Sequence, residues 1–309
     1  GRTSSDGGGP VVGWVVGMIL ITGGTGFVGS HVVHALRVLD QPVRVLARKP
    51  KMQDRLRAWG AEVVQGDIRD AESLRRAAEG TETVVHLVAI PPFSGDEAVE
   101  RLMVQGTHDL VAAAKDGGVK RFVLMSALGA KKEAQDVAPY LRGKWAMEEA
   151  VKGSGVDHTI FRPSFIFGRD GGMLPSLLKL ARYSPVLPVP STLRLQPIWV
   201  EDVAGFFAGA VEGKGDGTYE LGGPDQVSWS ELFDRIRRVL GKRRLKVQIP
   251  LGLSKAGATV AQIVPPLRGA RGAVAMLGHE DNVTDIGPAV ETFGIQPISL
   301  DDQIRRAAA

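Results

Sequence analysis

A glycine-rich loop near the start of the chain constrains the fold more than any other feature. The sequence there reads MILITGGTGFVGSH, and Gly23, Gly26 and Gly29 follow one another at three-residue spacing. They stand between a short apolar run, residues 18–22, and an amphipathic stretch, residues 27–39. Glycines in this setting allow a tight turn, a close backbone approach to a pyrophosphate, and close packing of a helix on a strand. The loop therefore predicts a dinucleotide site at the N-terminus of a helix.

The rest of the first half repeats the same alternation of strands and helices. The strand-like runs are short, rich in β-branched residues and almost without polar alternation, which is typical of a parallel sheet covered on both faces. Strands are predicted over residues 43–47, 61–66, 83–89 and 121–126, and helices over residues 97–115 and 138–153. Repeated units of this length predict an α/β fold with a doubly wound parallel Rossmann sheet.

The pattern changes after Ile160, and this change divides the chain of 309 residues. We expect residues 1–17 to be an N-terminal tail or extension, and residues 18–164 to form the dinucleotide-binding domain. Residues 165–309 are expected to form mainly a smaller C-terminal lobe for a substrate or a partner. Within that part, residues 218–223 (TYELGG) are predicted to return to the main sheet as a strand.

Composition excludes several classes of site. The sequence has no cysteine, so disulfides and thiolate metal sites are excluded, and the six histidines show no metal-binding spacing, so no metal is predicted. The net charge of +4 is a mild excess. Because its densest basic cluster, residues 44–57, lies beside the predicted phosphate site, we expect no nucleic-acid partner.

An apolar segment, residues 250–267, raises the question of a membrane. Lys255 and Gln262 interrupt it and two prolines end it, so it makes a poor transmembrane helix and no transmembrane segment is predicted. An amphipathic helix packed on the lobe is the preferred interpretation, and docking on a membrane complex is the alternative. We expect a cytoplasmic protein, and the alternative is a peripheral location at the inner face of a membrane.

Two side chains after the second and third strands bear on the choice of cofactor. An acidic residue at the end of the second strand would favour NAD(H), but the sequence there reads VLARKPK. A guanidinium at Arg48 suits a 2′-phosphate, so NADP(H) is preferred over NAD(H). A plain surface charge is the alternative for Arg48. Asp67 is expected either to face the adenine or to cap the helix that starts near Ala71.

A tyrosine and a lysine stand four positions apart in PYLRGKW, residues 139–145. On a helix, Tyr140 and Lys144 share a face, so the ammonium is expected to favour the phenolate and make the tyrosine a usable acid near neutral pH. Ser126, at the end of the fifth strand, is a candidate to hydrogen-bond a substrate carbonyl. His86 lies within an apolar strand, where a satisfied core imidazole is the better interpretation.

The motifs TGGTGFVG, GDIRD, YLRGK, FRPSFIFG and VEDVA, in this order, resemble the short-chain dehydrogenase/reductase superfamily on its extended and atypical side. More narrowly, the sequence resembles bacterial relatives of the NAD(P)H-binding accessory subunit of respiratory complex I. By position, the resemblance implies a catalytic trio of Ser126, Tyr140 and Lys144. It also implies a set of cofactor-binding residues: Gly23, Thr25, Gly26, Phe27, Val28, Gly29, Arg48, Asp67, Ile68, Leu87, Val88, Ala89, Lys144 and Pro163.

Two departures from the pattern bear on activity. Met103 stands where the superfamily usually has an asparagine that supports a proton relay, and a thioether donates no hydrogen bond. The expected lining of the lobe is apolar, so a substrate is expected to be a hydrophobic carbonyl compound such as a quinone, an isoprenoid or a steroid-like molecule. This lining comprises Phe165, Phe167, Met173, Leu174, Leu177, Trp199 and Phe206.

Three functions remain open from the sequence. The first is an NADP(H)-binding protein whose cofactor is structural or sensory and whose partner belongs to a respiratory membrane complex, as the resemblance implies. The second is an NADPH-dependent reductase or epimerase-like enzyme. The third, a redox-sensing regulator of transcription factors, has the least support, because the basic residues are largely accounted for by the phosphate site.

Overall fold

The main part of the molecule is built on a seven-stranded parallel sheet. The computed structural model describes residues 17–91, 94–134, 136–189, 193–248 and 280–309. The strand order is β11-β6-β5-β4-β1-β2-β3, which is doubly wound, as predicted. Residues 1–16 of the predicted tail lie outside the described residues, and so does the apolar segment 250–267. The strands are β1 (Ile19–Thr22), β2 (Val43–Ala47), β3 (Glu62–Gln65), β4 (Thr83–His86), β5 (Arg121–Met125), β6 (Asp157–Pro163) and β11 (Gly217–Leu221).

Helices cover both faces of this sheet, which explains why its strands show almost no polar alternation. Ile19 and Ile21 of β1 belong to one hydrophobic core with α1 (Phe27–Val38) and α8 (Val200–Val211). Leu20, between them, belongs to the opposite core with α3 (Ala71–Ala78), α5 (Gly106–Asp116) and α6 (Pro139–Lys152). Successive side chains of a strand point to opposite faces, so an uninterrupted apolar run fills both cores.

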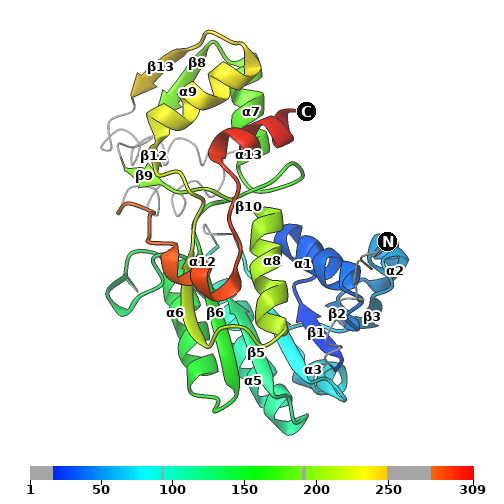
Figure 1. The fold of residues 1–309 in the computed structure, drawn as a ribbon. Helices are drawn as coiled ribbons and strands as arrows, with labels where there is room; N and C mark the ends of the chain where they lie inside the picture. The colour runs from blue at the N-terminus through cyan, green and yellow to red at the C-terminus, as the bar shows by residue number, and fades with distance from the viewer. Residues whose placement is uncertain (1–16, 92–93, 135, 190–192, 249–279) are drawn as a thin grey trace, which may run out of the picture.

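A smaller lobe lies above the carboxyl ends of the strands in the view of Figure 1. Its core packs α7 (Leu174–Tyr183), α9 (Trp229–Leu240) and α13 (Leu300–Ala308) together. Three strand pairs complete it: β7 (Ile166–Phe167) with β10 (Ile198–Trp199), β9 (Arg194–Leu195) with β12 (Val227–Ser228), and β8 (Val186–Val189) with β13 (Leu245–Gln248).

The chain after residue 165 contributes to both parts of the molecule. Helix α8 packs along α1, and β11 pairs with β6 in the main sheet. Helix α12 (Gly287–Phe293) contacts both α8 and β11. Figure 1 shows α8 and α12 below the lobe, beside the sheet. The chain therefore crosses between lobe and sheet several times.

The segment predicted as one helix over residues 97–115 is irregular. It begins with α4 (Asp96–Ala98), continues as a π-helix, η2 (Val99–Gln105), and only then becomes α5. A π-helical turn accommodates one extra residue within a helix and is found most often at functional sites. The other short elements are η1 (Pro50–Met52), α2 (Asp54–Ala58) and η3 (Lys132–Ala134).

Candidate dinucleotide site

A cavity of about 430 Å³ opens at the carboxyl ends of β1, β2 and β4. This is where ligands bind in doubly wound sheets. Every predicted cofactor residue except Lys144 and Pro163 lines the cavity. The complete lining is Thr22, Gly23, Thr25, Gly26, Phe27, Val28, Gly29, Leu46, Arg48, Gly66, Asp67, Ile68, Leu87, Val88, Ala89, Ile90, Leu102 and Met125.

A second, larger hollow of about 680 Å³ lies on the outer side of α1 and α8. Its walls include His34, Trp59 and Phe293, and none of the predicted site residues. It is away from the carboxyl ends of the strands, so the smaller cavity is the better candidate for the dinucleotide.

The three glycines of the loop have different physical roles. Gly23 has a φ of +80°, and a β-carbon there would stand 2.7 Å from the Leu87 carbonyl carbon. A β-carbon on Gly29 would stand 2.1 Å from the Gly23 carbonyl oxygen. Gly26 has an ordinary φ of −83°, and its β-carbon would meet nothing closer than that same oxygen, at 3.3 Å. Gly23 and Gly29 are therefore required by the fold, whereas the bare backbone of Gly26 leaves space for a ligand.

Helix α1 begins directly beneath this space. Its N-cap is Gly26, which offers no side-chain oxygen to the N–H groups of the first turn, and that turn carries no acidic residue. The uncapped N–H groups and the positive end of the helix dipole favour an anion. The residues present thus fit a pyrophosphate group.

Arg48 and Asp67 stand at the ends of neighbouring strands and both line the cavity. Arg48 is exposed, with its charge available to a ligand. Asp67 accepts a two-pronged hydrogen bond from the Arg69 guanidinium, with distances of 2.9 Å and 2.6 Å. Because Arg69 stabilises the carboxylate, the pKa of Asp67 lies below its usual value. Asp67 does not cap the following helix, since the N-cap of α3 is Asp70.

The other end of the cavity is apolar, and none of the predicted catalytic residues Ser126, Tyr140 and Lys144 lines it. Its wall there consists of Leu87, Val88, Ala89, Ile90, Leu102 and Met125. Lys144 is completely buried, and its ammonium donates a 2.7 Å hydrogen bond to the Met125 carbonyl oxygen. Lys144 therefore lies directly behind the cavity wall. Pro163 is buried at the end of β6, where its carbonyl accepts from the Leu128 N–H.

The electrostatics of Tyr140 and Lys144 differ from the expectation. The Lys144 nitrogen lies 5.7 Å from the centre of the Tyr140 ring. However, loss of hydration raises the pKa of Tyr140 to about 12, and it lowers the pKa of Lys144 to about 7. The prediction that Lys144 favours the phenolate was wrong for this state of the protein, because burial outweighs the attraction of a lysine that is itself only partly charged at neutral pH.

The Ser126 side chain contacts a buried ion pair, Glu148 with Arg162, which the sequence did not predict. Its side chain is 2% exposed and its hydroxyl donates a 2.5 Å hydrogen bond to Glu148. Glu148 also accepts from Arg162 of β6, at 2.8 Å and 2.7 Å, and from Lys152 at 3.1 Å. These donors keep the pKa of Glu148 below its usual value despite burial. The only available signal was spacing, since Glu148 follows Lys144 by four residues on the same helix face.

Met103 and His86 both serve packing around the site. The Met103 side chain is fully buried, and a β-carbon on Gly143 would stand 3.1 Å from its methyl carbon. His86 is also fully buried, between the Thr22 hydroxyl at 2.6 Å and the Thr107 hydroxyl at 3.0 Å. Burial lowers the pKa of His86 to about 3, so it is a neutral core imidazole, as the sequence predicts.

The apolar side chains expected to line the lobe are mostly core residues. Phe167, Leu174, Trp199 and Phe206 are at most 3% exposed. The remaining three are only partly buried: Phe165, Met173 and Leu177.

Two further expectations concern the described residues as a whole. None of their helices has the length and hydropathy needed to cross a bilayer. Among the same residues, no three His, Asp or Glu side chains cluster in a way that would hold a metal ion.

Comparisons with known proteins identify a matching family and similar sequences. The profile of a family described as NAD(P)H-binding matches residues 23–176. The ceramide reductase of Caulobacter vibrioides is 33% identical over 79% of this chain and 77% of the bacterial protein. Subunit 9 of the NADH dehydrogenase (ubiquinone) 1 alpha subcomplex of Arabidopsis thaliana is 29% identical over 77% of this chain, which spans 61% of the plant protein.

Solved structures show the same fold. Triphenylmethane reductase of Citrobacter sp., solved with NADP(H), superposes with a TM-score of 0.77 at 19% identity, over 94% of this chain and 99% of the reductase. UDP-glucose 4-epimerase of Thermotoga maritima, solved with UDP-glucose, superposes with a TM-score of 0.72 at 21% identity, over 94% of this chain and 97% of the epimerase.

Proposed function

Because this chain belongs to the NAD(P)H-binding family within the short-chain dehydrogenase/reductase superfamily, we propose that it is an NADPH-dependent reductase of a hydrophobic carbonyl compound. The observation that carries the proposal is the cavity itself. It runs from the glycine loop to an apolar end at Met125, and Lys144 lies directly behind that end. A site of this kind suits a dinucleotide whose reactive end lies against an apolar wall.

The residues would divide the work as follows. Backbone N–H groups of the first turn of α1 hold the pyrophosphate, and Arg48 pairs with the 2′-phosphate. NADPH, when bound, supplies the hydride. Tyr140 keeps its proton at neutral pH, so its phenol donates a hydrogen bond, and then the proton, to the substrate oxygen. Lys144 lies beside the ring and orients the ribose side of the cofactor. The apolar wall excludes water from the reacting carbon.

A direct test follows NADPH oxidation by absorbance with a panel of quinones, long-chain ketones and steroid ketones. We expect turnover of at least one of these compounds, and a loss of roughly a hundredfold or more in Tyr140→Phe, since that is the usual contribution of a general acid. Tyr183→Phe is the matched control, because Tyr183 is 76% exposed on the lobe. Equal rates in wild type and Tyr140→Phe would contradict the proposed role of the phenol.

The preference for NADP(H) rests on Arg48. Removing one charge-assisted pair with a phosphate weakens binding by roughly tenfold to a hundredfold. Arg48→Ala should therefore weaken NADPH binding by that factor and leave NADH binding unchanged. Lys49→Ala is the control, since Lys49 is also exposed but does not line the cavity. Tighter binding of NADH than of NADPH to the wild-type protein would rule the preference out.

A second candidate function is favoured by the contacts and the protonation of Ser126 and Tyr140. The Ser126 hydroxyl is bound to Glu148 and the pKa of Tyr140 is raised, so neither group is activated in this state. A cofactor with a structural or sensory role, together with a partner in a respiratory membrane complex, fits those observations and the similarity to the plant subunit. This candidate predicts that no panel compound is reduced, while Arg48→Ala loses both bound nucleotide and thermal stability.

A further inference from the structure

The outer end of the lobe carries an apolar surface that the described residues leave uncovered. Strands β8 and β13 form a parallel ribbon in which Leu245 is paired with Val186. One face of this ribbon is buried, since Leu187 and Val189 belong to the core of the lobe and Lys246 donates to Asp234 of α9 at 2.6 Å. The other face is open, with Leu245 65% exposed and Val247 44% exposed.

Two more exposed apolar side chains adjoin this face. Val186 is 37% exposed, and Tyr183, at the end of α7, is 76% exposed. The Arg244 guanidinium joins the two segments, because it donates to the carbonyl oxygens of Ala181 and Arg182. We refer to Tyr183, Val186, Leu245 and Val247 as the tip surface. An outward sheet face is normally polar, so a group of this kind needs a physical explanation.

Basic side chains lie on the segments that carry or precede the tip surface. They are all exposed, and they make no ion pair with any residue that the structure describes: Arg182, Arg238, Lys242 and Arg243. The turn that ends α9 brings three of them together, since the Gly241 and Lys242 N–H groups bond to the carbonyls of Arg238 and Arg237. The sequence contains no Asp or Glu between Asp234 and Glu280, and none in residues 174–189. The positive charge of this end is therefore not offset locally.

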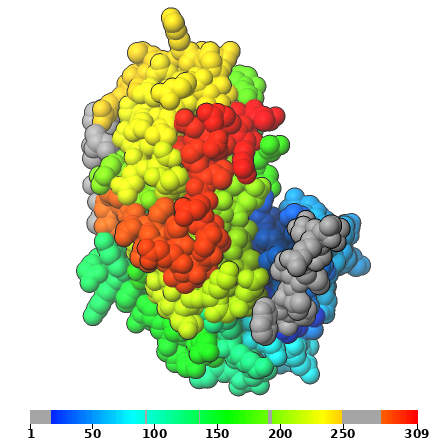
Figure 2. Space-filling view, in the orientation of Figure 1, coloured from blue at the N-terminus to red at the C-terminus, as the bar shows by residue number. Residues whose placement is uncertain are grey.

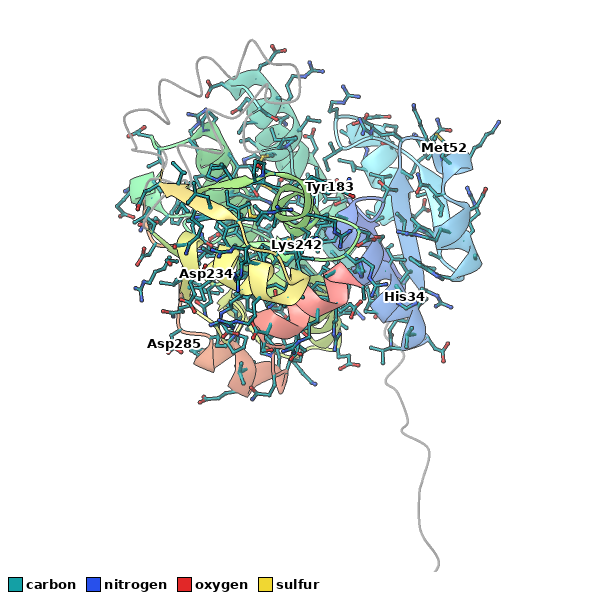
Figure 3. All side chains as sticks on the ribbon, turned by 90° about the horizontal axis from the view of Figure 1, so that it is seen from above. His34, Met52, Tyr183, Asp234, Lys242 and Asp285 are labelled. Carbon is teal, nitrogen blue, oxygen red and sulfur yellow. The ribbon has the colours of Figure 1, made fainter. Side chains whose placement is uncertain are left out.

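The tip surface lies at one extremity of the molecule. Figure 2 shows α9 and β13 as the yellow end of the surface, and Figure 3, which looks down on this end, labels Tyr183 and Lys242 on the lobe. The end of the lobe that carries the tip surface thus lies away from the Rossmann sheet.

We propose that the tip surface docks on a lipid bilayer that contains anionic head groups. Aliphatic side chains with a tyrosine among them, together with exposed Lys and Arg on the same segments, match the two layers of such a membrane. The cations meet the head groups, and the apolar side chains enter the boundary with the acyl chains. A nucleic acid would satisfy the cations but not the aliphatic side chains. An acidic protein surface would likewise leave Leu245 and Val247 without an apolar partner.

Docking goes beyond the proposed reductase function and does not depend on it. The tip surface is separate from the cofactor cavity, and the two share no residue. If both hold, docking would bring the lobe to the phase in which apolar carbonyl compounds dissolve.

The test is co-sedimentation of the protein with vesicles. We expect binding to vesicles of phosphatidylcholine mixed with phosphatidylglycerol, little binding to pure phosphatidylcholine, and weaker binding at high salt. Lys242→Gln with Arg243→Gln should weaken partition by roughly fivefold for each cation removed. Leu245→Ser with Val247→Ser should weaken it by roughly tenfold.

Matched controls separate this surface from general effects. Val38→Ser removes an apolar side chain that is 67% exposed on α1, and Lys115→Gln removes an exposed cation of α5. Both should bind vesicles like the wild type. Thermal melting and NADPH binding of every variant show that the fold and the cofactor site are intact.

Three results would overturn the proposal. One is absence of binding to anionic vesicles, and another is an equal loss of binding in the control variants. The third is self-association in sedimentation velocity that Leu245→Ser abolishes, since this would assign the surface to a second copy of the chain. Failure of the reductase assay alone would leave vesicle binding unchanged, so the two proposals fail separately.

Discussion

Gly23 and Gly26 differ in what occupies the space where a β-carbon would stand. Substitutions at the two positions should therefore affect different properties, stability at Gly23 and cofactor binding at Gly26. At Gly23 that space holds the backbone of Leu87, and φ is +80°. At Gly26 the nearest atom to that position is the Gly23 carbonyl oxygen, at 3.3 Å, and the residue lines the cavity. We expect Gly26→Ala to keep the thermal stability of the ligand-free protein but to weaken NADPH binding at least tenfold, because the methyl group occupies ligand space.

Gly23→Ala is the comparison for that prediction. It should unfold at a clearly lower temperature or accumulate in insoluble form, since the substitution is strained in both conformation and space. Thermal melting with and without NADPH measures both effects. If Gly26→Ala binds NADPH as tightly as the wild type does, the pyrophosphate does not lie over Gly26.

His86 should make stability depend on pH. Its pKa is lowered to about 3 in the folded protein, against about 6.5 when unfolded. The unfolded chain therefore binds more protons between these values, and the free energy of unfolding falls as pH falls through that window. The integrated loss is about 4 kcal/mol at the bottom of the window.

The matching variant is His86→Gln, which keeps a side chain able to accept and donate hydrogen bonds. We expect it to be less stable than the wild type near pH 7 and to lose less stability on acidification. Urea unfolding of both proteins at about pH 7 and about pH 4 measures the difference. Parallel pH profiles for the two proteins would show that His86 does not titrate on unfolding.

At the scale of elements, Gly143 explains how α6 approaches the π-helix η2. A β-carbon on Gly143 would stand 2.6 Å from a methyl carbon of Val99. Alanine favours an isolated helix by about 1 kcal/mol over glycine, but overpacking a core costs about 1–3 kcal/mol. We therefore expect Gly143→Ala to destabilise the protein, as measured by urea unfolding.

Val99→Ala supplies the matched test of that contact. On its own it should destabilise the protein by creating a cavity, but in the double variant the new methyl group fills part of that space. The double variant should be more stable than the sum of the two single effects predicts. Simple additivity would mean that the two helices do not meet at Gly143.

Helix α6 also shows the limit of sequence reasoning at this scale. Its length and its apolar face could be predicted, and it spans Pro139–Lys152 as expected to within one residue at each end. Spacing placed Tyr140 and Lys144 on one face, but it could not reveal that Glu148 pairs with Arg162 of β6, which is a tertiary contact. The partner of Ser126 followed from that contact and not from any local pattern.

At the scale of the whole molecule, residues 280–285 tie the lobe to the main sheet. Glu280 pairs with Lys131 after β5 at 2.7 Å, and Asp281 pairs with Arg194 of β9 at 2.8 Å. The Thr284 hydroxyl donates to Glu220 of β11, and its N–H donates to Gln196 at 2.7 Å. This short segment thus connects strands of both parts.

We expect Thr284→Val to lower the free energy of unfolding by about 1 kcal/mol, since it removes the hydroxyl without changing the shape of the side chain. It should also speed hydrogen exchange in residues 280–286, as measured by mass spectrometry. Thr292→Val is the control, because the Thr292 hydroxyl donates to a local acceptor, the Pro288 carbonyl of the same helix. Equal effects of the two substitutions would show that the segment does not couple the parts.

The amino-acid sequence by itself determined the α/β class, the parallel sheet and the cofactor loop. Those features depend on local spacing and on apolar periodicity, which one stretch of chain carries alone. The tertiary structure decided which distant groups meet: Ser126 with Glu148, Glu148 with Arg162, and Lys144 with the Met125 carbonyl. It also decided the direction of the Tyr140 pKa, because that depends on how much water the surrounding elements remove, and no spacing within one helix records this.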